Sequence, residues 1–316
     1  MILIITHSSD VTADYQCARL RKEQAHFVRI DSDTLTSRVS IRASEFETSL
    51  AIDGRSYTTA DVSCVWLRRP KAIDVHGTDP AERAHSATEW GEALEGFLSQ
   101  LPERVWINHA SRNARASHKI EQLSRARAAG LLVPPTLVTQ DADEAQAFAA
   151  AHGGRIIVKP LFSGYIERAT VDQDSQIYTS RVELEHLERR ELLKRCPTLF
   201  QAEIAKDYDV RACFVDGRLR CVRMDRASLR GNQILDIRRD NMESVRYTPM
   251  DAPADVSSRL TALMVHYGLR FAAIDFAVTR EGDWIFFEIN PNGQWAWLDL
   301  AGATDVAGDL AWAMRR

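Results

Sequence analysis

Asp275, Glu288 and Asn290 bring three oxygen donors into two runs of otherwise apolar sequence. The runs are FAAIDFAV and WIFFEI, and the TREGD between them is typical of a β-hairpin turn. A lone acid in a strand usually marks a solvated edge, but three donors together, with no Lys or Arg expected beside them, need a counter-ion when buried. Carboxylate and amide oxygens suit hard cations, so these residues predict an Mg²⁺ site, with the ion carried on a nucleotide phosphate.

The alternation of side chains along a strand predicts which neighbours share a face with these donors. Asp275 should share a face with Ala273 and Ala277, whose small side chains leave room for a bulky group. Glu288 and Asn290 should share a face with Trp284 and Phe286.

Two lysines could meet a phosphate, although each is also compatible with an ordinary surface position. Lys159 ends the apolar run Arg155–Lys159 and precedes the small loop LFSGY, an arrangement that can hold an ammonium over phosphates. A snorkelling strand-end lysine is an equally good interpretation. Lys119 lies within a predicted helix, where a solvated side chain is the commoner outcome. The spacing of a Walker A loop is absent.

Arginines form two further candidate groups. Arg211 and Arg238 each follow an aspartate by two residues, Asp209 and Asp236, which places each pair on one strand face. The segment RRPK at 68–71 follows an apolar strand and could bind an anion, but a solvated loop is the commoner meaning of such a run.

The composition describes an ordinary globular protein. The 316 residues are 45% hydrophobic and 27% charged with a net charge of −4, which argues against a dedicated nucleic-acid binder. Five scattered cysteines without CxxC spacing suggest neither disulfides nor a zinc site. Neither a signal peptide nor an apolar run long enough to span a membrane is evident, so we expect a reduced, cytoplasmic, enzyme-like protein.

Hydrophobic periodicity and turn residues predict an α/β lobe that ends near His109, followed by mixed helices and strands. The first loop lacks GxGxxG, so a Rossmann dinucleotide site is not supported. Predicted strands cover 1–6, 27–30, 62–67, 105–108, 137–139, 155–159, 199–204 and 210–215, with a hairpin-like excursion at 39–58 and a turn at 216–217. Predicted helices cover 12–24, 86–101, 111–130, a segment from Asp141 to Gly153, 183–195, 252–268 and 299–314.

The ordered set of Lys119, Lys159, the QAEI segment, Asp209 with Arg211, and the three oxygen donors resembles the ATP-grasp ligases. More narrowly, the segments VWLRRPK, PPTLVT, IIVKPLFSG and EINPNGQWAWL resemble graspetide synthetases, the microviridin-type peptide ligases. The resemblance implies an α/β fold with α+β lobes: an N-terminal pre-ATP-grasp domain at 1–109, a central ATP-grasp lobe at 110–200 and a C-terminal lobe with the metal site at 201–316.

The resemblance also implies roles for the individual residues. ATP would lie between the two lobes, with its phosphates on Lys119 and Lys159 and its adenine and ribose beside Gln201, Glu203 and Ile204. Asp209 is counted with these nucleotide-binding residues. Asp275, Glu288 and Asn290 would hold Mg²⁺, and the catalytic arginines Arg211 and Arg238 would stabilise the transferring phosphate. The segment NGQWAWL at 292–298 would border the acceptor site, although the residues alone suggest a turn into core aromatics.

The implied activity is the ATP-dependent joining of Asp or Glu side chains of a ribosomal precursor peptide, leader plus core, to Ser or Thr hydroxyls or Lys amines. The expected protein is a homodimer that binds neither nucleic acid nor membrane. One alternative is a ligase of the glutathione-synthetase or glutamate-ligase type, which acts on a small molecule or a protein C-terminus. Another is a nucleotide-binding scaffold without catalysis.

Overall fold

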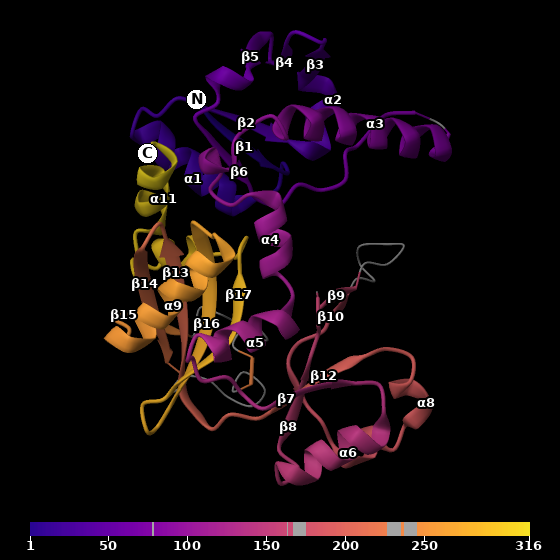
Figure 1. The fold of residues 1–316 in the computed structure, drawn as a ribbon, viewed down its shortest axis with the longest axis vertical. Helices are drawn as coiled ribbons and strands as arrows, with labels where there is room; N and C mark the ends of the chain where they lie inside the picture. Colours follow the sequence, from indigo (N-terminus) through magenta and orange to yellow (C-terminus); the bar gives the residue numbers. More distant parts are fainter. Residues whose placement is uncertain (78, 163, 167–174, 226–234, 237–244) are drawn as a thin grey trace.

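The computed structural model describes residues 1–77, 79–162, 164–166, 175–225, 235–236 and 245–316. Three groups of strands follow one another along the chain and lie in different parts of the molecule (Figure 1). The mixed α/β architecture that the sequence predicts is confirmed.

The first unit is built on a parallel sheet of order β2-β1-β6. Asp10 starts its first helix by accepting hydrogen bonds from the backbone N–H groups of Thr12 and Ala13. Asp53 and Gly54, both with positive φ, form the predicted turn at 52–54 between β4 and β5. The elements are β1 (Ile2–Thr6), α1 (Val11–Lys22), β2 (Phe27–Asp31), α2 (Leu35–Arg38), β3 (Val39–Ala43), β4 (Thr48–Ile52), β5 (Arg55–Thr58), β6 (Cys64–Leu67) and α3 (Pro80–Leu98).

The predicted strand at 105–108 is wrong. Glu103–Val105 is a short 3₁₀ turn, and Trp106 forms only one parallel bridge, to Val65. The chain turns away there because the buried Asn108 binds another segment: its Nδ2 donates to the carbonyl of Phe271 (2.8 Å), and its Oδ1 accepts from the backbone of the same residue (3.1 Å). These hydrogen bonds attach the end of the first unit to the C-terminal sheet.

The second unit is a four-stranded antiparallel sheet of order β11-β8-β12-β7. Ile156 and Phe200 pack against alanines of α6, so this sheet has a small core of its own. The predicted single helix at 183–195 is two short ones. The elements are β7 (Thr136–Thr139), α6 (Ala142–Ala151), β8 (Ile156–Lys159), β9 (Tyr165–Ile166), β10 (Ser175–Gln176), β11 (Ser180–Arg181), α7 (Leu184–Leu187), α8 (Arg190–Leu193) and β12 (Thr198–Ala202).

The third unit is a five-stranded antiparallel sheet of order β15-β14-β13-β16-β17, which includes the predicted hairpin. Its strands are β13 (Lys206–Val215), β14 (Arg218–Asp225), β15 (Arg246–Met250), β16 (Phe271–Thr279) and β17 (Trp284–Asn290). One face is covered by α9 (Ala254–Tyr267) and α5 (Lys119–Ala128). The apolar residues of α9, Val256, Leu260, Leu263, Met264 and Tyr267, follow the helical spacing that produces one buried stripe.

The predicted helix at 111–130 is two helices, α4 (Ala110–Ala116) and α5, separated at Ser117 and His118. Gln122 fixes α5 to the sheet, because its side chain donates to the carbonyl of Ile289 and accepts from the N–H of the same residue. The expected boundaries at 109 and 200 stay a prediction. That division assigns α4 and α5 to the central lobe, whereas both pack with the five-stranded sheet.

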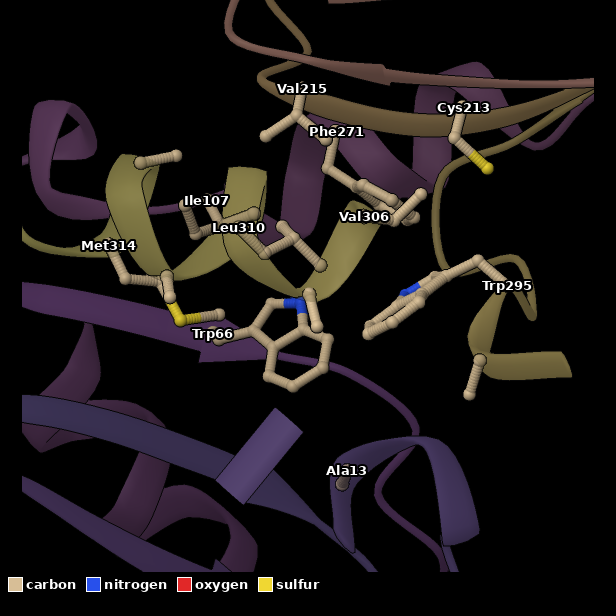
Figure 2. Packing of buried hydrophobic residues seen from close by; sticks show 14 of the residues in the cluster. Ala13, Trp66, Ile107, Cys213, Val215, Phe271, Trp295, Val306, Leu310 and Met314 are labelled. Carbon is tan, nitrogen blue, oxygen red and sulfur yellow. The ribbon is translucent and has the colours of Figure 1, made fainter. Parts of the chain in front are cut away.

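The first unit and the five-stranded sheet share one hydrophobic core. Two C-terminal helices, α10 (Ala296–Leu300) and α11 (Val306–Met314), lie between them, and Leu310 and Met314 pack beside Trp66 (Figure 2). The predicted helix at 299–314 is therefore interrupted. The carboxylate of Asp299 accepts from the N–H groups of Val306 and Ala307 and so starts α11 as a separate helix.

Within the described part of the chain, every helix is too short or too polar to pass through a lipid bilayer. The four-stranded sheet contributes no residue to the core that joins the first unit to the five-stranded sheet. The described residues thus form one body that contains both ends of the chain and a second body built around β7, β8 and β12.

Candidate functional site

One face of the five-stranded sheet is apolar at one end and charged at the other. Cys213, Val215, Phe271 and Ala273 point from this face into the core shared with the first unit. Two residues further along the same alternation, β13 presents Arg211 and β16 presents Asp275, which are direct partners in the ladder. The strand periodicity that buries one end of the face therefore delivers the charged side chains to the other end.

A β-bulge corrects the predicted faces of β17. Asp275 pairs with Glu288, but the next residue of β16, Phe276, pairs with Phe286, so Phe287 is an extra residue. Phe286 and Trp284 make edge contacts with Phe276 in the core beneath α9. The prediction that these two aromatics share a face with Glu288 and Asn290 is wrong, because one inserted residue reverses the alternation.

The side chains of the three predicted metal ligands converge, and it is the amide nitrogen of Asn290 that faces the two carboxylates. Asn290 Nδ2 lies 3.2 Å from a carboxylate oxygen of Glu288 and 3.4 Å from one of Asp275. Among the described residues no three His, Cys, Asp or Glu side chains form a metal-binding group. Two carboxylates and one amide are nevertheless a donor set that fits Mg²⁺, which keeps several waters and takes few protein ligands.

The expectation that no cation lies beside these acids is wrong. Arg211 Nη1 donates to Asp275 Oδ1 at 2.7 Å, and Lys119 Nζ lies 3.4 Å from Glu288 Oε2. Burial lowers the pKa of Arg211, but the charges of Asp275 and Glu288 and the hydrogen bond to Asp275 act together against it, and the pKa is raised overall. The pairing offsets the desolvation of both charges.

Lys159 is the second predicted phosphate contact. It belongs to the four-stranded sheet, and its side chain extends to β17 of the five-stranded sheet. Its ammonium stands over the ring of Phe287, 4.1 Å from the centroid, so the extra residue of the bulge becomes its platform. Burial lowers the pKa of Lys159 to about 8, Glu288 opposes this shift, and two other lysines add to it. Lys119 Nζ also donates to the carbonyl of Pro160 at 2.7 Å, directly after Lys159.

Lys206 belongs to the same cluster and was not among the predicted residues. Its ammonium donates to both carboxylate oxygens of the buried Asp209, at 2.7 and 2.8 Å. Lys206 and Lys159 line the same cavity, and the charge of Lys206 lowers the pKa of Lys159. Its place in the polar segment AKDYD, at the start of a strand, carries no signal beyond an ordinary surface lysine.

The predicted base-binding residues lie on the same side as Lys159. Glu203 and Ile204 line a cavity of about 150 Å³ together with Lys159, Lys206 and Phe287. Glu203 forms a two-pronged ion pair with Arg181. Gln201 is buried in β12 and donates to Thr136 Oγ1 at 3.0 Å, but it does not line this cavity. The predicted Arg238 lies outside the described residues.

In the RRPK segment Arg69, Pro70 and Lys71 are exposed, as expected of a loop, but Arg68 is buried, with only 1% of its surface exposed. Its Nε lies 3.0 Å from Asp10 Oδ2, and its Nη1 donates to the carbonyls of Asn292 (3.1 Å) and Gly293 (3.3 Å). Its Nη2 donates to Gln294 Oε1 at 3.1 Å. Burial raises the pKa of Asp10, but Arg68 and the hydroxyl of Thr6 outweigh it and lower the pKa overall.

The loop at 291–294 is held from both sides, because Arg211 Nη2 donates to the carbonyl of Gln294 at 2.7 Å. Gly293 has no space for a side chain there. An added Cβ would lie 2.5 Å from Ala273 Cβ and 3.0 Å from Arg211 Nη2. The loop that follows Asn290 is therefore positioned by buried arginines of two units, and it was not predicted to be.

Comparison with known proteins agrees with this architecture over the whole chain. The family model described as the MvdD pre-ATP-grasp domain matches residues 1–114. Macrocyclase MdnC from Microcystis aeruginosa MRC, solved with precursor peptide MdnA, has a TM-score of 0.84 and 25% identity, covering 100% of this chain and 99% of its own. None of the curated protein sequences matches the chain.

Two other solved structures contain nucleotide. A RiPP-associated ATP-grasp ligase of Chryseobacterium gregarium, in complex with ADP and a leader and core peptide, has a TM-score of 0.85 and 27% identity, covering 98% of this chain and 95% of its own. The ATP-grasp ligase PsnB, with Mg, ADP and a phosphomimetic variant of its minimal precursor, has a TM-score of 0.74. At 20% identity, covering 99% of this chain and 97% of its own, PsnB shows the shared fold.

We expect Gly293→Ala to destabilise the protein by about 1–3 kcal/mol, the usual result of overpacking a filled site. Urea unfolding measures the loss. Gly96→Ala is the matched control, because a Cβ there meets nothing within 4 Å and the position is inside α3. Equal stability of the Gly293→Ala protein and the wild type would show that the loop has room to move.

We expect the Lys159 amine to react with acylating reagents at unusually low pH, since its pKa is about 8 rather than 10.5. Acylation of the peptide that contains Lys159, followed by mass spectrometry between pH 6 and 11, should be half-maximal near pH 8. Because the unfolded chain keeps the Lys159 proton between these two pKa values while the folded chain loses it, Lys159 contributes a gain in stability as pH rises through that window. The buried cysteines act in the opposite direction there, so the contribution of Lys159 is read as the difference between the wild type and Lys159→Met. A midpoint near 10.5 would contradict the desolvation of the ammonium.

Proposed function

We propose that the chain, which is an ADP-forming ATP-grasp ligase related to the graspetide macrocyclases, closes rings in a ribosomally made precursor peptide. A peptide substrate is supported by one observation above all. The chain is similar, over almost the full length of both chains, to MdnC and to the Chryseobacterium gregarium ligase, which were both solved with peptides. The geometry that supports ATP as the second substrate is the convergence of Lys119, Lys159 and Glu288 from different elements on one point.

Bound MgATP supplies a γ-phosphoryl group that converts a peptide carboxylate into an acyl phosphate, with release of ADP. A hydroxyl or amine of the same peptide then displaces phosphate, which forms a side-chain ester with Ser or Thr or an amide with Lys. Each ring therefore removes one water from the peptide. Such chemistry asks the protein mainly to position the groups and to neutralise charge.

We assign the residues of this chain to those two tasks. Lys119 and Lys159 would contact the phosphates. Lys206, which is paired with Asp209, would be a third phosphate contact. Asp275, Glu288 and Asn290 would hold Mg²⁺ in place of the ammonium and guanidinium groups that neutralise the acids in this structure. Arg211, the partner of Asp275, would stabilise the transferring phosphate, the role also proposed for Arg238.

The cavity between β8, β12 and Phe287 is the proposed base pocket. Ile157 and Ile204 provide apolar walls, and the backbone after Ala202 provides hydrogen-bonding groups for an adenine edge. Glu203 is the proposed ribose ligand, since it stands at the cavity rim in its ion pair with Arg181. Gln201 does not line the pocket, and its side chain instead donates a hydrogen bond to Thr136 in the neighbouring strand β7. A homodimer and the cytoplasm as its location stay predictions.

We expect Glu288→Gln to lower peptide turnover by a factor of at least about 100, because an amide neutralises less of the metal's charge and removes the partner of Lys119. The assay is ADP release with a precursor peptide sought among the short open reading frames beside the gene. Glu281→Gln, in the exposed turn of the same hairpin, is the control and should keep full activity. Wild-type turnover by the Glu288→Gln enzyme would contradict the assignment of Glu288 as a metal ligand.

The ring linkage can be tested on the product of the same assay. Hydroxylamine cleaves esters and leaves amides intact, so cleavage of all rings indicates acceptor hydroxyls and complete resistance indicates acceptor lysines. A product that carries neither linkage would contradict the proposed chemistry.

A further inference from the structure

Arg69 differs from the other arginines around the loop at 291–294. Its Nε donates to the carbonyl of Asn292 at 3.1 Å, which tethers the side chain two residues after Asn290. Its two terminal nitrogens contact no hydrogen-bond acceptor among the described residues, and the side chain is exposed. Arg68 and Arg211, by contrast, use both terminal nitrogens on carbonyl, amide or carboxylate oxygens.

The charge of Arg69 is only partly compensated. Although the side chain is exposed, partial desolvation lowers the pKa of Arg69, the charge of Arg211 lowers it further, and Asp10 acts in the opposite direction. Asp10 already forms the ion pair with Arg68 and accepts hydrogen bonds from Thr6 and from the start of α1. Two guanidinium groups that repel each other beside the proposed metal site favour an anion near both.

We propose that Arg69 binds a side-chain carboxylate of the acidic peptide substrate and so helps to deliver it to the phosphate. This inference rests on the proposed function. A guanidinium held at Nε presents its remaining N–H groups in a fixed fork, which matches both oxygens of a carboxylate. The first unit, through the residue after its buried Arg68, would thus contribute a specificity-determining contact to a site built mainly by the other two units.

The test is a double-mutant cycle measured by peptide binding. A precursor peptide sought among the short open reading frames beside the gene carries a fluorescent label, and a second version has every core Asp and Glu replaced by its amide. Affinity is measured by anisotropy with ADP and Mg²⁺ present. We expect Arg69→Gln to weaken binding of the acidic peptide about tenfold, the size expected for one charge-assisted hydrogen bond. The amide peptide should bind the variant and the wild type equally.

The controls separate a contact from a structural effect. Arg69→Lys should fall between wild type and Arg69→Gln, since an ammonium keeps the charge but loses the fork. Arg42→Gln, exposed on β3 of the same unit, should change nothing. If Arg69→Gln weakens both peptides equally, or neither, the inference is overturned. If the wild type does not modify the peptide at all, the proposed function fails, and this inference with it.

Discussion

The ion pair of Arg68 with Asp10 is the interaction on which the rest of the site depends. Breaking a buried pair of this kind typically costs about 3–5 kcal/mol, because the remaining charge stays buried without a partner. Here the guanidinium also donates to two carbonyls and a side-chain amide of residues 292–294. One side chain therefore joins the first helix of the first unit to the loop that follows the proposed metal ligand Asn290.

The hydrogen bonds of Arg68 and a shared hydrophobic core together join the first unit and the five-stranded sheet into one body. Trp66 and Leu310 belong to this core, which also includes residues of β1 and β13, and Arg211 and Asp275 lie beyond Cys213 and Ala273 on the same face of the sheet. The second body carries Lys159 and most of the base pocket. Its described contacts with the first body at the site are mainly polar, such as the bond from Lys119 to Pro160 and the contact of Lys159 with Phe287.

The strand pattern predicted the parts of the site that depend on local alternation. Asp275 and Glu288 are ladder partners because two short β-rich runs flank a turn, and the end of the apolar run at Lys159 marks where its ammonium leaves the sheet. The same alternation gave a wrong prediction for the faces of β17, because Phe287 is an extra residue in that strand. Whether a strand contains a bulge depends on its partner's register, and the letters WIFFEI are compatible with either alternation.

Long-range partners explain the other differences between prediction and structure. The RRPK segment has the composition of a surface loop. Arg68 is nevertheless buried, because it binds Asp10 and the loop at 291–294, which are remote from it in sequence. The segment at 105–108 has the composition of a strand, but Asn108 ties it to the backbone at Phe271 instead. Lys206 resembles any strand-end lysine until Asp209 and Lys159 are seen beside it.

The most direct test of the account is the stoichiometry of the reaction. ADP release and the mass of a precursor peptide, sought among the short open reading frames beside the gene, are followed together in one reaction with the wild-type enzyme and MgATP. We expect each ADP formed to be matched by the loss of one water from the peptide, and omission of ATP to leave the peptide mass unchanged. ADP formation without a change in peptide mass, or loss of water without ATP, would contradict it.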